Sequence, residues 1–214
     1  MKADKTKTHL KESDLIFLHD KYFKPAMILS GVIPVMIYLA GLAPSVTFED
    51  SGELITAAYS WGIPHEPGYP LFTMLGKLFS YLPVGNVAWR INLMSAVFSS
   101  AGIMFLFCTC VLWLRELKAG FISVTALIAS LCVGISPAYF SQSVITEVYG
   151  LNNFFTGFLL WILFQWRLAR LNNLTGIDKY FYAFCFLAGS TLTNHHISLI
   201  FIPFGLFVIW SADR

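Results

Sequence analysis

The sequence predicts an all-α, polytopic membrane protein, and its composition is the first observation behind that prediction. Of its 214 residues, 57% are hydrophobic and only 12% are charged, about half the charged share of a soluble domain. The mean hydropathy is +0.67. This composition excludes a soluble enzyme, a disordered chain and a small secreted domain held by disulfides.

The distribution of the charges is the second observation. Five stretches of at least 19 residues contain no charged side chain. A helix needs about 20 mostly apolar residues to cross a bilayer, so each stretch is long enough for a span. The stretches are Pro25–Phe48, Ile91–Leu114, Ala119–Thr146, Val148–Trp166 and Tyr180–Ala212.

The basic residues predict the orientation. Residues 1–24 hold six lysines, and most other Lys and Arg residues follow the second and fourth spans. Only Lys77 and Arg90 fall on the opposite side. By the positive-inside rule, residues 1–24 form a cytoplasmic segment and residues 25–214 a transmembrane domain whose first span is an uncleaved anchor. The net charge of +2 is too small to suggest nucleic acid as a partner.

We expect about six spans. The last stretch would be near 50 Å long as one helix, and Asn194-His195-His196 interrupts it, so we expect two short spans with an outward turn; a re-entrant pair is the alternative. Residues 137–142 form a short outer loop. The expected spans are Ala26–Ala43, Ile91–Leu114, Phe121–Ser136, Val148–Trp166, a fifth from Tyr180, and Ile197–Trp210.

The long outer loop, residues 44–90, carries most of the functional signal. It holds four acidic residues and two segments, Ser51–Trp61 and Leu71–Leu82, that we interpret as short interfacial helices joined by a rigid Pro/Gly turn. Loops rich in polar residues on a rigid scaffold are where binding and catalysis concentrate.

Asp50 and Glu53 are spaced so that both can face one cavity from the start of a helix. Such a pair suits a general base or a metal ligand. The same residues also fit a capping box, with Asp50 as the N-cap and Glu53 reaching back. The two interpretations are compatible, and spacing alone does not separate them.

The turn that follows places His65 before Gly68, Tyr69 and Pro70. Proline fixes φ, and glycine lets the backbone approach a ligand. On these residues alone, a turn that redirects the chain with a solvated histidine is the favoured interpretation.

Four further polar residues lie at the outer ends of the expected spans. Glu147 is interpreted as a helix N-terminal charge or as a group facing a cavity. His195 and His196 fit a turn between spans or a functional site. Arg90 fits a snorkelling side chain or a phosphate ligand. No His-Glu-x-x-His spacing occurs, so no metal site is predicted, although a divalent cation stays open.

The first loop also carries a resemblance. Thr47-Phe48-Glu49-Asp50-Ser51-Gly52-Glu53, Gly62–Leu71, Pro83–Asn92 and Glu147-Val148-Tyr149 together resemble a bacterial multi-pass membrane family related to the transmembrane protein O-mannosyltransferases. Glu66 departs from the family pattern, which usually has proline there. Members of the family continue with further spans, so we expect this chain to be incomplete at its C-terminus.

The resemblance implies the N-terminal part of a GT-C-like glycosyltransferase. Its donor would be a polyprenyl-phosphate sugar, with mannose the expected sugar, and its acceptor a Ser/Thr hydroxyl of a translocated protein at the outer or lumenal face. Asp50 and Glu53 would be catalytic. The substrate-binding residues would be His65, Gly68, Tyr69, Pro70, Arg90, Glu147, His195 and His196.

The resemblance also sets the expected surroundings and the alternatives. The membrane would be a bacterial inner membrane, or the endoplasmic reticulum in a eukaryote. Membrane lipid is an expected partner, and no cofactor is expected beyond the lipid-linked co-substrate. A multi-pass transporter and an inactive fragment or scaffold are the alternatives.

Overall fold

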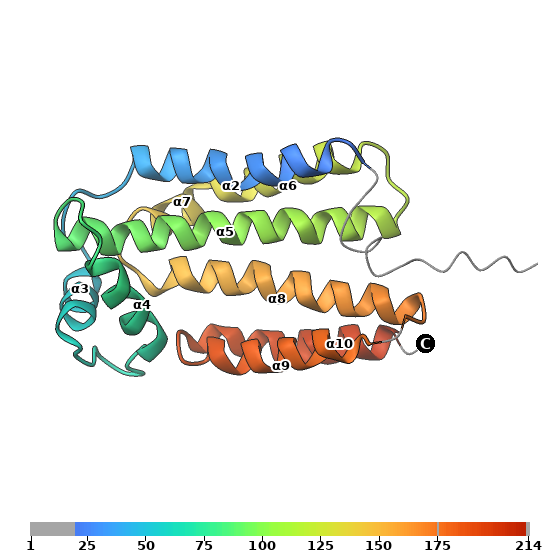
Figure 1. The fold of residues 1–214 in the computed structure, drawn as a ribbon. Coiled ribbons are helices and arrows are strands. Elements are labelled where there is room, and N and C mark those ends of the chain that lie inside the picture. Colours follow the sequence, from blue (N-terminus) through green and yellow to red (C-terminus); the bar gives the residue numbers. More distant parts are fainter. Residues whose placement is uncertain (1–19, 175, 213–214) are drawn as a thin grey trace, which may run out of the picture.

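The computed structural model describes residues 20–174 and 176–212, and all regular structure within them is helical (Figure 1). This confirms the all-α class. The elements are α2 (Phe23–Ala40), α3 (Ser51–Ser60), α4 (Pro70–Ser80), α5 (Val87–Glu116), α6 (Ile122–Ile135), α7 (Pro137–Ser143), α8 (Val148–Leu171), α9 (Asp178–Thr191), the 3₁₀ helix η1 (His196–Ile200) and α10 (Phe201–Ala212).

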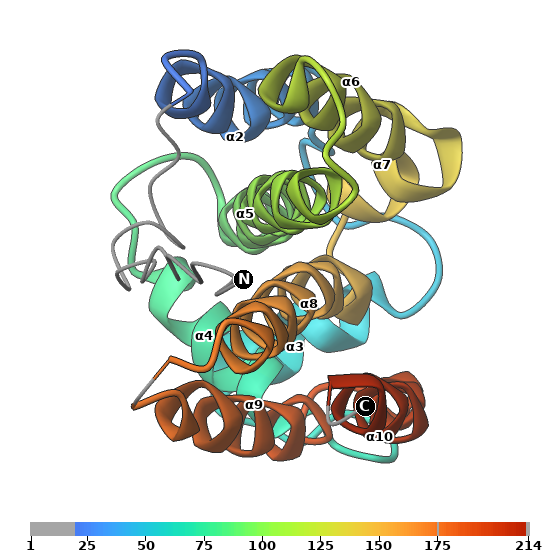
Figure 2. The same cartoon turned by 90° about the vertical axis from the view of Figure 1, so that its right-hand side faces the viewer.

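The helices α2, α5, α6, α8, α9 and α10 run side by side as a bundle, and α3 and α4 lie together at one end of it (Figure 1). Viewed along the bundle, α5 and α8 are central, with α2 and α6 on one side and α9 and α10 on the other (Figure 2). Among the described residues, α2 and α5 are long and apolar enough to cross a membrane. The pair α6 and α7, bent by 66°, would make a third span.

The connection between α6 and α8 differs from the expected loop, because Pro137–Ser143 forms the short helix α7. Ser136 has an extended backbone with ψ of 143°, and Pro137 occupies the first helical turn. Proline is favoured there because its missing N–H would have no partner within the helix. Pro137 therefore starts a helix where the sequence predicts a loop.

The central pair α5 and α8 is in backbone contact. A Cβ on Gly157 would lie 2.3 Å from the carbonyl oxygen of Gly102, and one on Gly102 would lie 2.6 Å from that of Asn153. Small residues permit this approach between packed helices. The glycines thus set the spacing of the two helices at the centre of the bundle.

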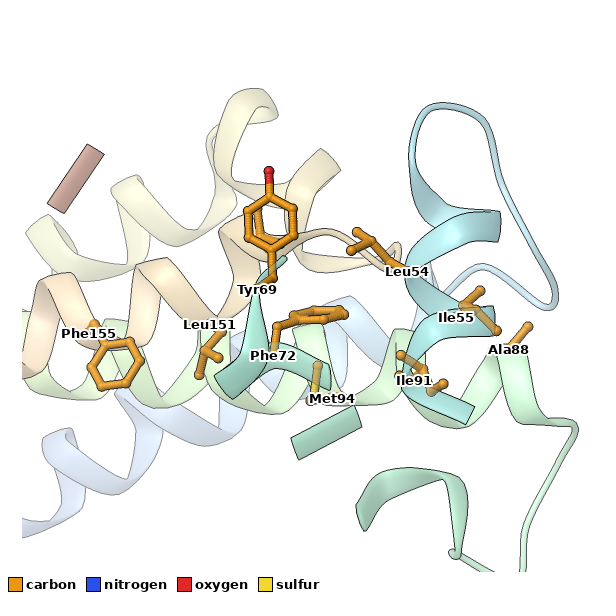
Figure 3. Packing of buried hydrophobic residues seen from close by; sticks show 11 residues of the cluster. Leu54, Ile55, Tyr69, Phe72, Ala88, Ile91, Met94, Leu151 and Phe155 are labelled. Atoms are coloured by element: carbon orange, nitrogen blue, oxygen red, sulfur yellow. The ribbon is translucent and has the colours of Figure 1, made fainter. Parts of the chain in front are cut away.

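A hydrophobic cluster fixes α3 and α4 to the bundle (Figure 3). Leu54 and Phe72 are buried against Ile91 and Leu151, so that α3, α4, α5 and α8 share one core. Burying each such side chain contributes about 1.5–3 kcal/mol. The two short helices are therefore held in fixed positions beside the start of α8.

Buried hydrogen bonds fix the start of the outer loop. Asn92 Nδ2 donates to the carbonyl oxygens of Ala43 and Ser45, at 2.9 and 3.1 Å. Asn92 Oδ1 accepts from the Thr146 hydroxyl at 2.5 Å. One side chain of α5 thereby joins the loop that leads to α3 and the segment that leads to α8.

Candidate functional site

The core of the site is a pair of acids beside a histidine, brought together from the start of α3 and the turn before α4. The His65 backbone N–H donates to Glu53 Oε1 at 2.5 Å, and Nδ1 of the His65 ring lies 3.0 Å from Glu53 Oε2. On the other side of the ring, Nε2 lies 3.8 Å from Asp50 Oδ2. One ligand atom from each of these three residues lies within 4.8 Å of the others, so they could hold a metal ion.

The capping box does not form. Asp50 is the N-cap residue of α3, but its side chain makes no capping hydrogen bond. Glu53 contacts His65 instead of reaching back to the N-cap. The two carboxylates are therefore directed at the turn, and the Asp50 side chain is 57% exposed.

The turn positions Tyr69 on the histidine. Gly68 and Tyr69 have φ of +89° and +40°, and Pro70 begins α4. A tyrosine with positive φ costs on the order of 1–3 kcal/mol and persists only when its surroundings hold it. Here the ring is buried in the cluster of Figure 3. Its hydroxyl lies 3.2 Å from His65 Nε2.

The hydrogen bond between Glu53 and His65 shifts the pKa values of both side chains. It holds the pKa of Glu53 below its usual value, and it raises the pKa of His65. Smaller contributions to the rise come from the charges of Asp50 and Glu147. The site therefore favours a positive charge at the position of the imidazole.

Glu147 approaches the same cluster from the start of α8. It is 3% exposed, and its Oε1 has no hydrogen-bond partner among the described residues. Burial, followed by the charges of Asp50 and Glu49, raises its pKa to about 7. Glu147 is thus a buried carboxylate within electrostatic range of Asp50.

The turn between α9 and η1 adds an aromatic wall. The His195 ring stacks on Tyr69 with centroids 6.5 Å apart at 14°, and it lies 5.3 Å from the ring of Tyr149. Burial and then the neighbouring His196 lower the pKa of His195. Asn194 is fully buried and donates to the Val148 carbonyl at 3.1 Å, which ties this turn to α8.

The structure gives Arg90 other partners. Its guanidinium donates to the carbonyl oxygens of Val84, Ser80 and Gly85 at 2.6, 2.7 and 2.8 Å. These three bonds hold the connection between α4 and α5. His196 begins η1, with its ring centroid 6.4 Å from that of His195.

Sequence reasoning left two residues out of the predicted site. Tyr149 contacts His195, and Asn194 anchors the turn that carries it. Each is adjacent or nearly adjacent to a residue that was selected, but neither carries a charge. Predicting these two residues requires knowing that α8 contacts the turn between α9 and η1, and the sequence does not show that contact.

The fold and the site define a class: an apolar helical bundle, with helices long enough to cross a membrane and a cluster of acids and a histidine at one end. Residues 50–214 match the N-terminal domain family of protein O-mannosyl-transferase TMEM260, and the chain belongs to this family. The expected relation to O-mannosyltransferases is thereby confirmed.

Two curated relatives support the assignment. The chain is 31% identical to protein O-mannosyl-transferase tmem260 of Dictyostelium discoideum over 88% of its length and 24% of that protein. It is 34% identical to protein O-mannosyl-transferase TMEM260 of Mus musculus over 78% of its length and 23% of that protein. The chain thus spans about a quarter of these relatives, both of which are eukaryotic. No solved structure matches it.

Proposed function

We propose that this chain forms the site-bearing N-terminal part of a membrane glycosyltransferase that transfers mannose to Ser/Thr hydroxyls of proteins. The names of its relatives support the reaction class. The observation that carries the proposal is the convergence of Asp50, Glu53 and His65 at one end of an apolar bundle. There a lipid-linked donor in the membrane and a protein acceptor in water can meet.

Asp50 is the proposed general base. Its carboxylate is more than half exposed, whereas Glu53 is engaged by two bonds to His65. In the proposed step the acceptor oxygen bonds to the anomeric carbon of the sugar, and its proton passes to Asp50. The bond from that carbon to the phosphate oxygen breaks, and the polyprenyl phosphate leaves with the electron pair. A single displacement inverts the anomeric centre.

The other residues are proposed to position the reactants. Glu53 orients His65 through Nδ1, and the Tyr69 hydroxyl contacts the other ring nitrogen, Nε2. Glu147, His195 and His196 lie at the start of α8 and in the neighbouring turn. We propose that these three residues line the donor side of the site.

The surroundings belong to the same proposal. We infer a GT-C-like fold, six spans, a cytoplasmic N-terminus and a site on the lumenal side. The eukaryotic relatives favour the endoplasmic reticulum over a bacterial inner membrane. A polyprenyl-phosphate sugar is the proposed donor because the site adjoins apolar helices.

The test uses membranes that contain the complete protein as wild type, Asp50→Asn and the control Glu66→Gln. Glu66 is an exposed acid of the same turn. With radiolabelled polyprenyl-phosphate mannose, we expect Asp50→Asn to lower label in protein at least 100-fold, and Glu66→Gln to change it less than twofold. Full transfer by Asp50→Asn would overturn the assignment of the base, and label in lipid alone would overturn the protein acceptor.

A further inference from the structure

We propose that a divalent transition-metal ion, Mn²⁺ or Zn²⁺, binds between His65 Nε2 and the Asp50 carboxylate, while Glu53 orients the histidine through its other nitrogen. This site goes beyond the transfer reaction, because cation binding does not depend on it. Any part that the ion plays in transfer rests on the proposed function.

The geometry around His65 supports this arrangement. If Nδ1–H donates to Glu53 Oε2 at 3.0 Å, Nε2 carries its lone pair on the opposite side of the ring and is an acceptor. Asp50 Oδ2 lies 3.8 Å from Nε2. Two ligand atoms that each lie about 2.1 Å from one metal are roughly 3–4 Å apart, so the spacing fits a shared ion. A carboxylate on the second nitrogen is the usual support of a metal-bound histidine.

The contact of Tyr69 identifies the same nitrogen. Its hydroxyl lies 3.2 Å from His65 Nε2 and, in this tautomer, donates to it. Nε2 then carries a lone pair, which a metal ligand requires, and it lies on the side of the ring near Asp50. The metal would replace the tyrosine proton as the partner of the lone pair.

A second and independent observation is the buried carboxylate of Glu147. It is 3% exposed, and its Oε1 has no hydrogen-bond partner among the described residues. The charge of Asp50 contributes to the raised pKa of Glu147, and the charge of Glu147 contributes to the raised pKa of His65, so Glu147 is close enough to interact electrostatically with both. A buried carboxylate with one unpartnered oxygen is costly to ionise, and a bound cation would offset that cost.

The balance of charge points the same way. In the described part of the chain, His65 is the only basic side chain that forms an ion pair with Asp50 or Glu53. Arg90 is engaged with three carbonyl oxygens. A leaving phosphate would add negative charge to a site that already holds several carboxylates, and a divalent cation with open coordination positions would compensate for it.

The ligand types select the kind of ion. An imidazole nitrogen together with carboxylate oxygen suits Mn²⁺ and Zn²⁺, whereas Ca²⁺ and Mg²⁺ prefer oxygen ligands alone. The side chains of Asp50 and His65 are both partly exposed, so water or a phosphate oxygen can occupy further positions.

The test is Mn²⁺ binding to the complete protein in phosphatidylcholine nanodiscs, after EDTA treatment and removal of the chelate, followed by electron paramagnetic resonance. We expect one saturable ion per chain, with nitrogen coupling from the imidazole in wild type. Asp50→Asn and His65→Ala should weaken binding at least tenfold, Glu53→Gln 10- to 100-fold, and Glu66→Gln less than twofold. Absence of saturable binding or of nitrogen coupling would overturn the site.

Variants that fail to fold are recognised by an altered elution volume in size-exclusion chromatography and a lowered melting temperature. The nitrogen coupling is measured on the wild type, so this part of the test does not depend on any variant. The transfer assay separates the two proposals. Nitrogen-coupled Mn²⁺ without any mannose transfer would support the metal site and contradict the proposed function. Asp50-dependent transfer in EDTA, together with no Mn²⁺ binding, would support the proposed function and contradict the metal site.

Discussion

Glu53 holds His65 at two points, because Oε1 accepts the backbone N–H at 2.5 Å and Oε2 lies 3.0 Å from Nδ1. The two residues are 12 positions apart, so this contact fixes the turn before α4 to the first turn of α3. It also orients the imidazole ring, although both side chains are partly exposed. The ring can therefore present Nε2 to Asp50 in a fixed direction.

Replacing Glu53 by Gln is expected to lower the pKa of His65 toward the ordinary value of 6.5, because the largest cause of its rise is the hydrogen bond to Glu53. Histidine-selective NMR of the complete protein in EDTA measures this pKa. The Glu66→Gln variant serves as the control and should leave it unchanged. An unaltered pKa in Glu53→Gln would show that the pair does not form.

The same pair predicts a pH window for its stabilising effect. The pKa of Glu53 is lowered, so its contribution is present above the unfolded pKa and is lost as pH falls through the folded value. The pKa of His65 is raised, so its contribution is present at low pH and is lost as pH rises through the folded value. The contact is therefore strongest between these two values.

Glu147 is expected to make the protein less stable as pH rises from about 4.5 to about 7. The folded pKa is about 7 against 4.5 for the free group, so the unfolded state loses its proton first and is favoured at higher pH. The effect reaches about 3 kcal/mol at most. Melting curves in EDTA between pH 5 and 8 should show a smaller decrease for Glu147→Gln than for wild type. Equal decreases would mean that Glu147 is not a buried acid.

Two of the expected spans correspond to helices, α2 and α5, that are long and apolar enough to cross a membrane, because bilayer thickness imposes a length on uncharged stretches. Ile91–Leu114 lies within α5, and the polar break at Asn194 separates α9 from η1. The site was predicted less completely. Tyr149 meets His195 only through the packing of α8 against the following helices, and no local pattern encodes that contact.

Arg90 illustrates a different limit of sequence reasoning. An outer arginine beside an expected lipid-phosphate site suggests a phosphate ligand, but its donors are directed at backbone carbonyls of the preceding loop. The loop conformation decides between these partners, and composition does not reveal it.

Replacing Arg90 by Lys tests which partner matters. An ammonium group cannot reproduce the three divergent bonds of the guanidinium, so we expect a lower melting temperature. The KM for the lipid-linked donor should stay within about twofold, because three N–H groups of this side chain already donate to backbone carbonyls. A rise in KM of tenfold or more without loss of stability would assign Arg90 to the phosphate.

Asn92 is expected to be among the most sensitive polar positions outside the site. Its removal leaves the Ala43 and Ser45 carbonyls and the Thr146 hydroxyl without their buried partner. Asn92→Ala should destabilise the fold by about 2–4 kcal/mol. Asn172→Ala, which removes one exposed bond, is the control and should cost well under 1 kcal/mol. Similar unfolding free energies for the two variants would contradict the buried network.

Alanine is expected to change the stability in opposite directions at two glycines, one in the contact between α5 and α8 and one in α9. Gly157→Ala would place a methyl group 2.3 Å from the Gly102 carbonyl oxygen, so the helices must separate, at a cost of about 1–3 kcal/mol or more. Gly189 lies in α9 with nothing within 4 Å of an added Cβ. Gly189→Ala should therefore stabilise that helix by up to about 1 kcal/mol, the usual difference in helix propensity.

Thermal melting of both variants in the same detergent measures this difference. Transfer activity should fall in Gly157→Ala, because α8 carries Glu147 and Tyr149 at its start and any displacement moves them relative to Asp50. It should persist in Gly189→Ala, whose added methyl group contacts nothing. A stable and fully active Gly157→Ala would show that the two central helices are not in backbone contact, and the placement of Glu147 beside the acids would lose its support.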